Sequence, residues 1–379
     1  MPVPQGEEQR LLDGVRIVSL AEQYPGPYAT LVLADLGADV IQVERPVGGD
    51  PARQFPGFYA AVARNKRSVA LDLKSENGLE AFGRLVADAD AVIEGFRPGT
   101  VDRLGVGYEH ARAINPAIVY VSISGYGQDG PYRGRPGHDL AYQAIAGLLA
   151  GSESATTGTE LQIGDLTAGM FAIIAVALGL MHRARTGSGL YVDVSMLDVL
   201  VSMNAARLVP AMNSLAEPLF MQGPAYRTYV ARDGKRLALA IAHEDRFWRS
   251  LCAVAGLEAY GDVGSDERIA RTSELQELLE RALSTRSRAE WVELLVAADV
   301  PVAPLNDLDD VWNDPQVVSR GLVVEVEGAD GTSQAHVRQP LVIPGFSTTP
   351  SRPAPRLGEH TEQVLGGEEP LPAAVVPAP

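Results

Sequence analysis

Cysteine is almost missing from this chain of 379 residues, which contains only Cys252. A single thiol excludes an intramolecular disulfide and a zinc site built from cysteines. The surrounding run, Ser-Leu-Cys-Ala-Val, is apolar and fits a helix, so we expect Cys252 to pack in a core rather than to act in catalysis. The sequence predicts no metal site.

Nucleotide-binding signatures are missing as well. The chain has no P-loop, and the Gly-Val-Gly-Tyr run at 105–108 lacks the strand–turn–helix context of a dinucleotide fingerprint. His243 and Glu244 are adjacent, but no second histidine follows at helical spacing, which excludes a zinc-protease motif. ATP and nicotinamide cofactors are therefore disfavoured.

Positive charge is scarce: 32 Lys and Arg stand against 48 Asp and Glu, giving a net charge of −16. Nucleic acid is therefore not an expected partner. The N-terminal run MPVPQGEEQR lacks the order of a signal peptide, and the longest apolar run, 167–181, is too short to span a membrane. We expect a cytoplasmic protein that does not bind a membrane, with this run forming a buried helix.

Apolar β-branched runs alternate with helical patterns through the first half of the chain. This alternation is typical of a parallel, doubly wound α/β sheet. The predicted strands are 15–21, 39–44, 68–73, 91–96, 118–124 and 190–195. The predicted helices among them are 28–36, 77–87 and 110–114.

The pattern changes near residue 223. An Asp-Gly turn joins two strand patterns in the manner of a hairpin, and helical patterns follow, which indicates a smaller α+β domain. Two further strand patterns, 322–326 and 336–344, close this domain. The proline-rich tail after residue 344 is expected to be a surface arm or partly disordered. The predicted divisions are a large domain over 1–205, a linker over 206–224, the small domain over 225–330, and over 331–379 a segment that returns to the large domain and ends in a C-terminal arm.

Residues 137–169 carry the strongest functional signal. His138 and Asp165 each stand at the start of a helical pattern, and two helix N-termini can present both groups to one cleft as an acid–base pair. The helix dipole would keep Asp165 ionised, as a base or a nucleophile. The structural alternatives are that Asp165 only caps its helix and that His138 is a surface residue. Asp139 is a candidate helix cap that orients the imidazole.

Cationic side chains recur at the ends of predicted strands. Arg45 ends the second strand, Arg64, Lys66 and Arg67 precede the third, and Arg97 follows the fourth. Their recurrence indicates a convergent site for phosphates, with solvated surface charge as the alternative.

Many ordered segments resemble the family III CoA-transferase superfamily (the CaiB/BaiF type), which contains CoA-transferases and α-methylacyl-CoA racemases. The likeness covers roughly residues 10–365. It is carried by LLDGVRI (11–17), ADLGADV (34–40), RNKRS (64–68), GFRPG (95–99), SGYGQ (124–128), GDL (164–166), VDVSMLD (192–198) and LGEHT (357–361).

The resemblance implies an interlocked homodimer in which the large domain holds the CoA moiety and the partner's small domain completes the cleft. It implies an acyl-CoA substrate and no cofactor beyond the CoA of that substrate. The residues that match the family's CoA contacts are Arg45, Arg64, Asn65, Lys66, Arg67 and Arg97.

The two chemistries of the superfamily share the carboxylate that Asp165 matches. In the transferases it attacks an acyl-CoA thioester to form a mixed anhydride, and CoA is then relayed to a second acid. The racemases add a Gly-His-Asp motif, as at 137–139, and a glutamate that pairs with the histidine, which Glu244 matches.

On this resemblance the leading prediction is a 2-methylacyl-CoA racemase or epimerase. His138 and Asp165 would exchange the α-proton through an enolate, whose oxygen would bind backbone N–H groups at the start of the Asp165 helix. A CoA-transferase with Asp165 as nucleophile is the second hypothesis. A non-catalytic protein that binds acyl-CoA through the arginine cluster is the third.

Overall fold

The structure is a computed structural model that describes residues 9–150, 161–215, 223–328 and 331–366. The end of the predicted C-terminal arm lies outside these residues. The chain divides into two compact units, one of Met1–Leu208 with Arg320–Pro379 and the other of Val209–Ser319. The second unit thus begins before, and ends before, the small domain that the sequence predicted over 225–330.

The first unit is built on a six-stranded sheet with the order β3-β2-β1-β4-β5-β6. All five neighbouring pairs are parallel. The strands are β1 (Arg16–Ser19), β2 (Asp39–Glu44), β3 (Arg67–Ala70), β4 (Ala91–Glu94), β5 (Val119–Ser124) and β6 (Leu190–Ser195). The order reverses between β1 and β4, so the predicted doubly wound α/β fold is confirmed.

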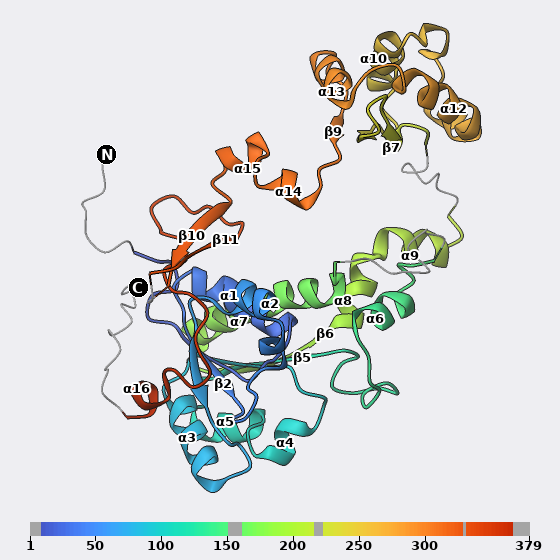
Figure 1. Cartoon of the computed structure of the whole chain (residues 1–379). Coiled ribbons are helices and arrows are strands. Elements are labelled where there is room, and N and C mark those ends of the chain that lie inside the picture. The colour runs from blue at the N-terminus through green and yellow to red at the C-terminus, as the bar shows by residue number, and fades with distance from the viewer. Residues whose placement is uncertain (1–8, 151–160, 216–222, 329–330, 367–379) are drawn as a thin grey trace. The chain divides into compact units, whose positions relative to one another are not determined.

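Helices cover both faces of this sheet (Figure 1). One face packs against α1 (Pro25–Asp35) and α7 (Ile163–Thr186), and the other against α3 (Glu76–Ala87) and α5 (Tyr108–Ile114). Successive residues of a strand point to opposite faces, so Ile17 joins the first core and Val18 the second. Burial on both sides explains why the strands are continuous apolar runs.

Shorter helices complete the first unit. They are the 3-10 helix η1 (Pro51–Gln54), α2 (Pro56–Ala63), α4 (Thr100–Leu104), α6 (Asp139–Ile145), α8 (Met196–Met203) and α9 (Ala205–Met212), whose last residues pass into the second unit.

Helix α7 is buried on one face only. A Cβ on Gly169 would lie 2.7 Å from the Pro25 carbonyl oxygen, and one on Gly179 would lie 2.4 Å from Val119 Cγ1, so these glycines allow close packing on α1 and β5. The other face exposes Phe171, Ile174 and Leu178, so the helix that the sequence predicted to be buried is buried on one side only. The sequence analysis judged the apolar run 167–181 too short to span a membrane. The whole helix α7 is longer than this run and, by length and composition only, is long and apolar enough to cross one.

The C-terminal segment returns to the first unit. The hairpin of β10 (Val323–Glu327) and β11 (Ser333–Val337) belongs to the first unit. The sequence analysis had placed these strand patterns at the end of the small domain. Further on, the His360 N–H donates to the Ser68 carbonyl (3.0 Å), and the Ala70 N–H donates to Thr361 Oγ1 (3.0 Å). Because β3 is an edge strand with unpaired backbone groups, it binds a tail that the sequence predicted to be a surface arm.

The second unit has its own core. An antiparallel sheet of β7 (Tyr226–Val230), β8 (Arg236–Ala240) and β9 (Val302–Pro304) packs with helices around Trp248 and Trp291. The helices of this unit are α10 (Asp245–Ala255), η4 (Glu258–Tyr260), α11 (Ser265–Ala270), α12 (Thr272–Leu283), α13 (Arg288–Ala297), α14 (Leu308–Val311) and α15 (Pro315–Ser319). The predicted hairpin is confirmed, as is core packing of Cys252, where burial raises the pKa of the thiol to about 12.

Candidate active site

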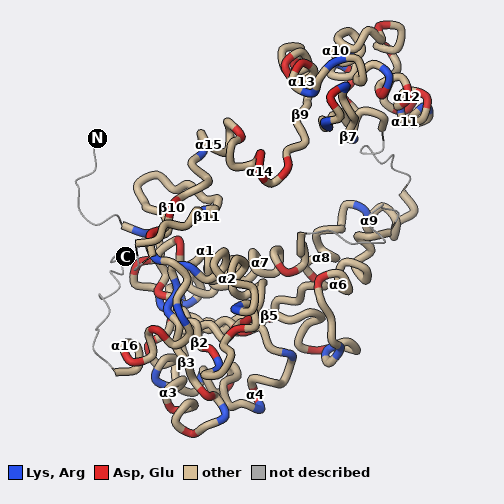
Figure 2. The backbone as a smooth tube through the Cα atoms, in the orientation of Figure 1, with Lys and Arg blue, Asp and Glu red and all other residues tan. Residues whose placement is uncertain are grey.

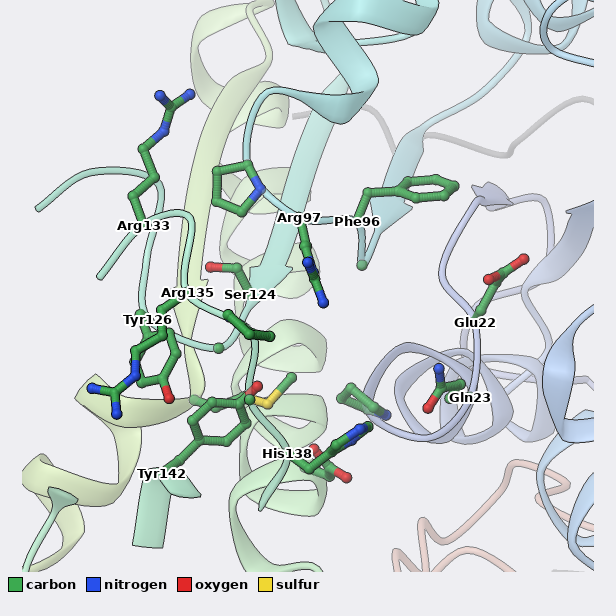
Figure 3. A pocket seen from close by; sticks show the side chains of 18 residues that line it. Glu22, Gln23, Phe96, Arg97, Ser124, Tyr126, Arg133, Arg135, His138 and Tyr142 are labelled. Carbon is green, nitrogen blue, oxygen red and sulfur yellow. The ribbon is translucent and has the colours of Figure 1, made fainter. Parts of the chain in front are cut away.

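A cavity of about 290 Å³ opens at the carboxyl ends of β1, β4 and β5. The strand order reverses at this point, which is where doubly wound sheets bind their ligands. Its lining comes from the residues that follow these strands and from the starts of α6 and α7, and it includes Glu22, Gln23, Arg97, Ser124, Tyr126, His138, Tyr142 and Asp165 (Figure 3).

Asp165 lies in the first turn of α7, inside the helix rather than at its cap. Gln162 holds the cap position and makes no side-chain cap bond. The start of the helix is capped instead by Asp139, whose Oδ1 accepts the N–H groups of Gly164 (2.5 Å) and Asp165 (3.2 Å). The interpretation of Asp165 as an ordinary helix cap is therefore wrong, and its side chain is available to the cavity.

The Asp165 carboxyl group has no hydrogen-bond partner among the residues that the structure describes. Burial, and secondly the negative charge of Asp139, raises the pKa of Asp165 to about 7. Asp139 accepts two of the N–H groups at the start of α7, so these two are not available to stabilise an ionised Asp165, which the sequence analysis expected of the helix dipole. Near neutral pH Asp165 passes between the acid and the carboxylate.

His138 immediately precedes α6 and lines the same cavity. Its side chain is solvent-exposed in this chain, and in Figure 3 the imidazole lies on the side of the cavity near Gln23. The structure therefore brings the two predicted groups, His138 and Asp165, to one cavity. Asp139 is buried beside them and contacts the start of α7 instead of the open space.

A wall of tyrosines forms one side of the cavity, which the sequence analysis did not anticipate. Tyr126 and Tyr142 pack edge to face with ring centroids 5.0 Å apart, and burial raises the pKa of Tyr142 to about 12. A Cβ on Gly125 would lie 2.5 Å from the Tyr142 hydroxyl oxygen, and one on Gly137 would lie 2.7 Å from a carbon of the same ring. The two glycines are the sequence signal, because they mark where an aromatic ring approaches the backbone.

Gln23 is a second lining residue that was not predicted. Its backbone has φ 67°, in the left-handed region that is unfavourable for glutamine. Asp50 holds this conformation because its Oδ1 accepts the Gln23 N–H at 3.0 Å. The only signal in the sequence is position, since Gln23 stands between the end of β1 and the first turn of α1.

Three arginines line the cavity, of which only Arg97 was predicted. The guanidinium group of Arg97 extends into the cavity between Glu22 and His138, whereas those of Arg133 and Arg135 point away from its centre (Figure 3). Arg45 lies at the rim, where its Nε is 3.4 Å from a Glu22 carboxylate oxygen. Arg45 and Arg97 are therefore the predicted cations that the structure places at this site.

The other four predicted CoA contacts, residues 64–67, lie inside the protein. Arg64 Nη2 is 2.7 Å from Asp35 Oδ2, and Arg67 pairs with Asp39. The buried Lys66 ammonium donates to the Pro27 carbonyl at 2.8 Å, and its desolvation lowers its pKa to about 7. Near β2 and β3 basic and acidic positions accordingly lie side by side (Figure 2). These side chains hold α1, β2 and the C-terminal segment together.

Glu244 belongs to the second unit. There it precedes α10, and its Oε2 accepts the Ala242 N–H at 3.1 Å. Its predicted pairing with His138 stays a prediction. No cluster of three or more His, Cys, Asp or Glu that could hold a metal ion occurs in the described part of the chain.

The description "CoA-transferase family III" belongs to a family model that matches residues 12–361. This chain is a member of that family. The succinate–glutarate CoA-transferase of Agrobacterium fabrum is 31% identical over 392 residues, covering 97% of this chain and 98% of the relative. The succinyl-CoA–L-malate CoA-transferase β subunit of Chloroflexus aurantiacus is 34% identical and covers 93% of each chain.

Solved structures agree with this assignment. A CaiB/BaiF family protein from Brucella suis has 30% identity and a TM-score of 0.84, over 95% of this chain and 99% of that one. The family III chain is therefore an enzyme that processes acyl-CoA thioesters. Its named relatives are transferases, and they do not support the racemase as the leading prediction.

Proposed function

We propose that this chain is a CoA-transferase that moves CoA between two carboxylic acids with Asp165 as the nucleophile. The observation that carries the proposal is the Asp165 carboxyl group, which lines the cavity, has no hydrogen-bond donor among the described residues and has a raised pKa. A carboxylate that nothing stabilises in the resting enzyme is a stronger nucleophile than a solvated one.

Each step of the proposed reaction moves one acyl group. A carboxylate oxygen of Asp165 attacks the thioester carbonyl carbon, and the C–S bond breaks to release CoA thiolate and leave a mixed anhydride. The thiolate then attacks the Asp165 carbonyl carbon, which releases the first acid and forms an Asp165–CoA thioester. The same two steps in reverse, with the acceptor acid, regenerate Asp165 and release the new acyl-CoA. No proton or electron is gained or lost.

The surroundings of α7 favour transfer over racemisation. An enolate needs donors aimed at its oxygen, and the sequence analysis assigned this role to N–H groups at the start of α7. Those of Gly164 and Asp165 already donate to the Asp139 carboxylate, so these two are not free to bind an enolate oxygen. The solvent exposure of His138 further weakens it as one half of a proton-transfer pair.

The acids are proposed to be dicarboxylic. Two of the relatives are named for succinate with glutarate and for succinyl-CoA with malate. Arg97 offers the cavity a guanidinium group that has no ion-pair partner in the described part of the chain, and Arg45 adds a second cation at the rim.

Arg45 and Arg97 both remain proposed contacts for the anionic groups of CoA. No resident cofactor beyond CoA is proposed, and the proposed location is the cytoplasm.

A homodimer is proposed as the working unit. The exposed face of α7 presents Phe171, Ile174, Leu178 and Met181, spaced so that all four share one side of the helix. An apolar stripe of this kind is typical of a subunit interface. Sedimentation of the purified protein would test this, and a single species with the mass of the monomer would contradict it.

Trapping the covalent intermediate tests the proposed function. The enzyme is incubated with succinyl-CoA and hydroxylamine, and the peptide that contains Asp165 is examined by mass spectrometry, with Asp165→Asn as the matched control. We expect a hydroxamate or a CoA adduct on Asp165 in the wild type alone. Exchange of deuterium into C2 of a 2-methylacyl-CoA without any adduct would support the racemase instead. Neither outcome across a panel of acyl-CoA thioesters would indicate a protein that only binds them.

A further inference from the structure

Asp139 is more deeply buried than the two cavity groups beside it. It begins α6 with a relative exposure of 6%, and both of its carboxylate oxygens are engaged. Oδ1 accepts the Gly164 and Asp165 N–H groups, and Oδ2 accepts the side-chain amide of Gln143 one turn further along α6. Asp139 thus connects the start of α6 to the start of α7.

Gly164 is a steric requirement of this connection. A Cβ at residue 164 would lie 2.7 Å from Asp139 Oδ1 and 3.0 Å from Leu200 Cδ1. No side chain can occupy that space while the 2.5 Å hydrogen bond is kept. Only glycine at position 164 lets the Asp139 carboxylate reach the backbone of α7. Asp165, the proposed nucleophile, follows this glycine directly.

Two consequences follow for Asp165. Its own backbone N–H is bound to Asp139, so the first turn of α7 cannot rotate away from the cavity without breaking that bond. The Asp139 charge is also the second cause, after burial, of the raised pKa of Asp165. One carboxylate therefore holds the other in position and adds to the effect of burial on its basicity.

We propose that Asp139 is a positioning residue that fixes the first turn of α7 and keeps Asp165 strongly nucleophilic by placing a second carboxylate behind it. The inference rests on the proposed function, in which Asp165 is the nucleophile. Asp139 does not touch the substrate in this proposal, because its carboxylate is buried and fully bonded.

Other ionisable groups also face Asp165 and must be considered in any pH profile. They are Tyr24 at the start of α1, Tyr142 on α6, and the cavity residues Glu22, Arg97, Arg133, Arg135 and His138. Each of them stays unchanged when Asp139 is replaced, so a shift caused by that replacement reports on Asp139.

The test is Asp139→Asn, which keeps an oxygen for the backbone N–H groups and removes the charge. Transfer from succinyl-CoA to glutarate is measured as kcat/KM against pH. We expect the acidic limb, which reports the pKa of Asp165 in the free enzyme, to move down by roughly one pH unit. Loss of nucleophilicity should lower the plateau by about tenfold.

Ser195→Ala is the matched control. The Ser195 side chain accepts the Asp198 N–H and caps the neighbouring helix α8, so its loss removes a cap without changing a charge near Asp165. We expect a lower melting temperature and an unchanged acidic limb. If Asp139→Asn lowers the plateau but leaves the limb where it was, Asp139 is only structural and the inference is wrong.

Two further measurements keep the inference open to refutation. Should Asp139→Asn fail to fold, Gly164→Ala displaces the same carboxylate and should move the limb in the same direction. The pKa of Asp165 can also be read by carbon NMR with no substrate, in the wild type and in Asp139→Asn. Equal values overturn the inference, even if the adduct experiment upholds the proposed function. A shift without any transfer activity refutes the proposed function alone.

Discussion

The first unit contains two groups of charged side chains, residues 64–67 and the pair Asp139–Asp165. They differ in whether the charges have partners of opposite sign. In the first group every cation has a partner, as in the Arg64–Asp35 pair at 2.7 Å. In the second, one carboxylate is buried beside another and receives no compensating cation within the described residues, so its pKa rises to about 7. A buried charge with a partner has the cost of its desolvation offset, whereas an unpaired carboxylate next to a cavity supplies reactivity at the expense of stability.

The largest expected effect comes from removing the reactive carboxylate. Asp165→Asn should reduce CoA transfer by at least about 10³-fold, since no other group in the cavity is proposed to form the anhydride. Initial rates with succinyl-CoA and several acceptor acids measure this. Residual activity within about tenfold of the wild type would refute Asp165 as the nucleophile.

Breaking the paired group should have the largest effect on stability. Arg64→Met leaves the fully buried Asp35 carboxylate without its guanidinium partner and should destabilise the protein by about 3–5 kcal/mol. Urea unfolding gives the value. The matched control is Arg84→Met, which breaks the exposed pair with Glu80 and should change stability by less than about 0.5 kcal/mol. Equal effects of the two variants would contradict the contrast.

Asn65 tests the attachment of the C-terminal segment. Its Oδ1 accepts the N–H groups of Ser351 (3.0 Å) and Arg352 (2.9 Å), and its Nδ2 donates to Asp35 (2.7 Å). Asn65→Ala should destabilise the protein by about 2 kcal/mol and raise hydrogen exchange over residues 350–366.

Asn115→Ala is the control for this variant. The Asn115 side chain makes three hydrogen bonds, to Val86, Ala89 and Ala117, shortly before β5 and away from the C-terminal segment. A similar loss of stability is expected, without faster exchange in the C-terminal segment. Unchanged exchange there in Asn65→Ala would show that this segment is held by other contacts.

The unpaired carboxylate should itself reduce stability in a pH-dependent way. The folded-state pKa of Asp165 is raised from 3.8 to about 7, so the native state binds a proton that the unfolded chain releases, and stability falls as pH rises between these values. Asp165→Asn should therefore stabilise by about 1–2 kcal/mol at about pH 8, after allowance for partial exposure, and by almost nothing at about pH 4. Thermal melts at both pH values check this, and a larger gain at the lower pH would contradict it.

The smallest expected effect is that of His138→Ala. If CoA transfer is the reaction, this variant should retain activity within about tenfold, because no step of the transfer needs an imidazole. A loss of transfer comparable with that of Asp165→Asn would show that the reaction needs the imidazole and would contradict this prediction. The same preparations can be assayed for deuterium exchange at C2 of a 2-methylacyl-CoA.

The sequence by itself determined the doubly wound sheet and the segments that form the site. Strand patterns are local, and burial on both faces makes them continuous apolar runs, so β2 and β6 were predicted at their observed bounds. The cavity, with His138, Asp165 and Arg97 in its lining, followed from the rule that ligands bind at the carboxyl ends of such strands.

Only the tertiary structure decided what each charged residue does there. Arg64 and Arg97 look alike in sequence. The difference is that Arg64 pairs with Asp35 on α1, whereas Arg97 lines the cavity and pairs with no carboxylate of the residues that the structure describes. Asp139 and Asp165 are 26 residues apart. From the sequence, Asp165 was the candidate cap of its own helix, but in the structure the Asp139 carboxylate caps the start of α7. Hydrogen bonds and burial depend on which distant segments come within about 3 Å, and that is set by packing rather than by local pattern.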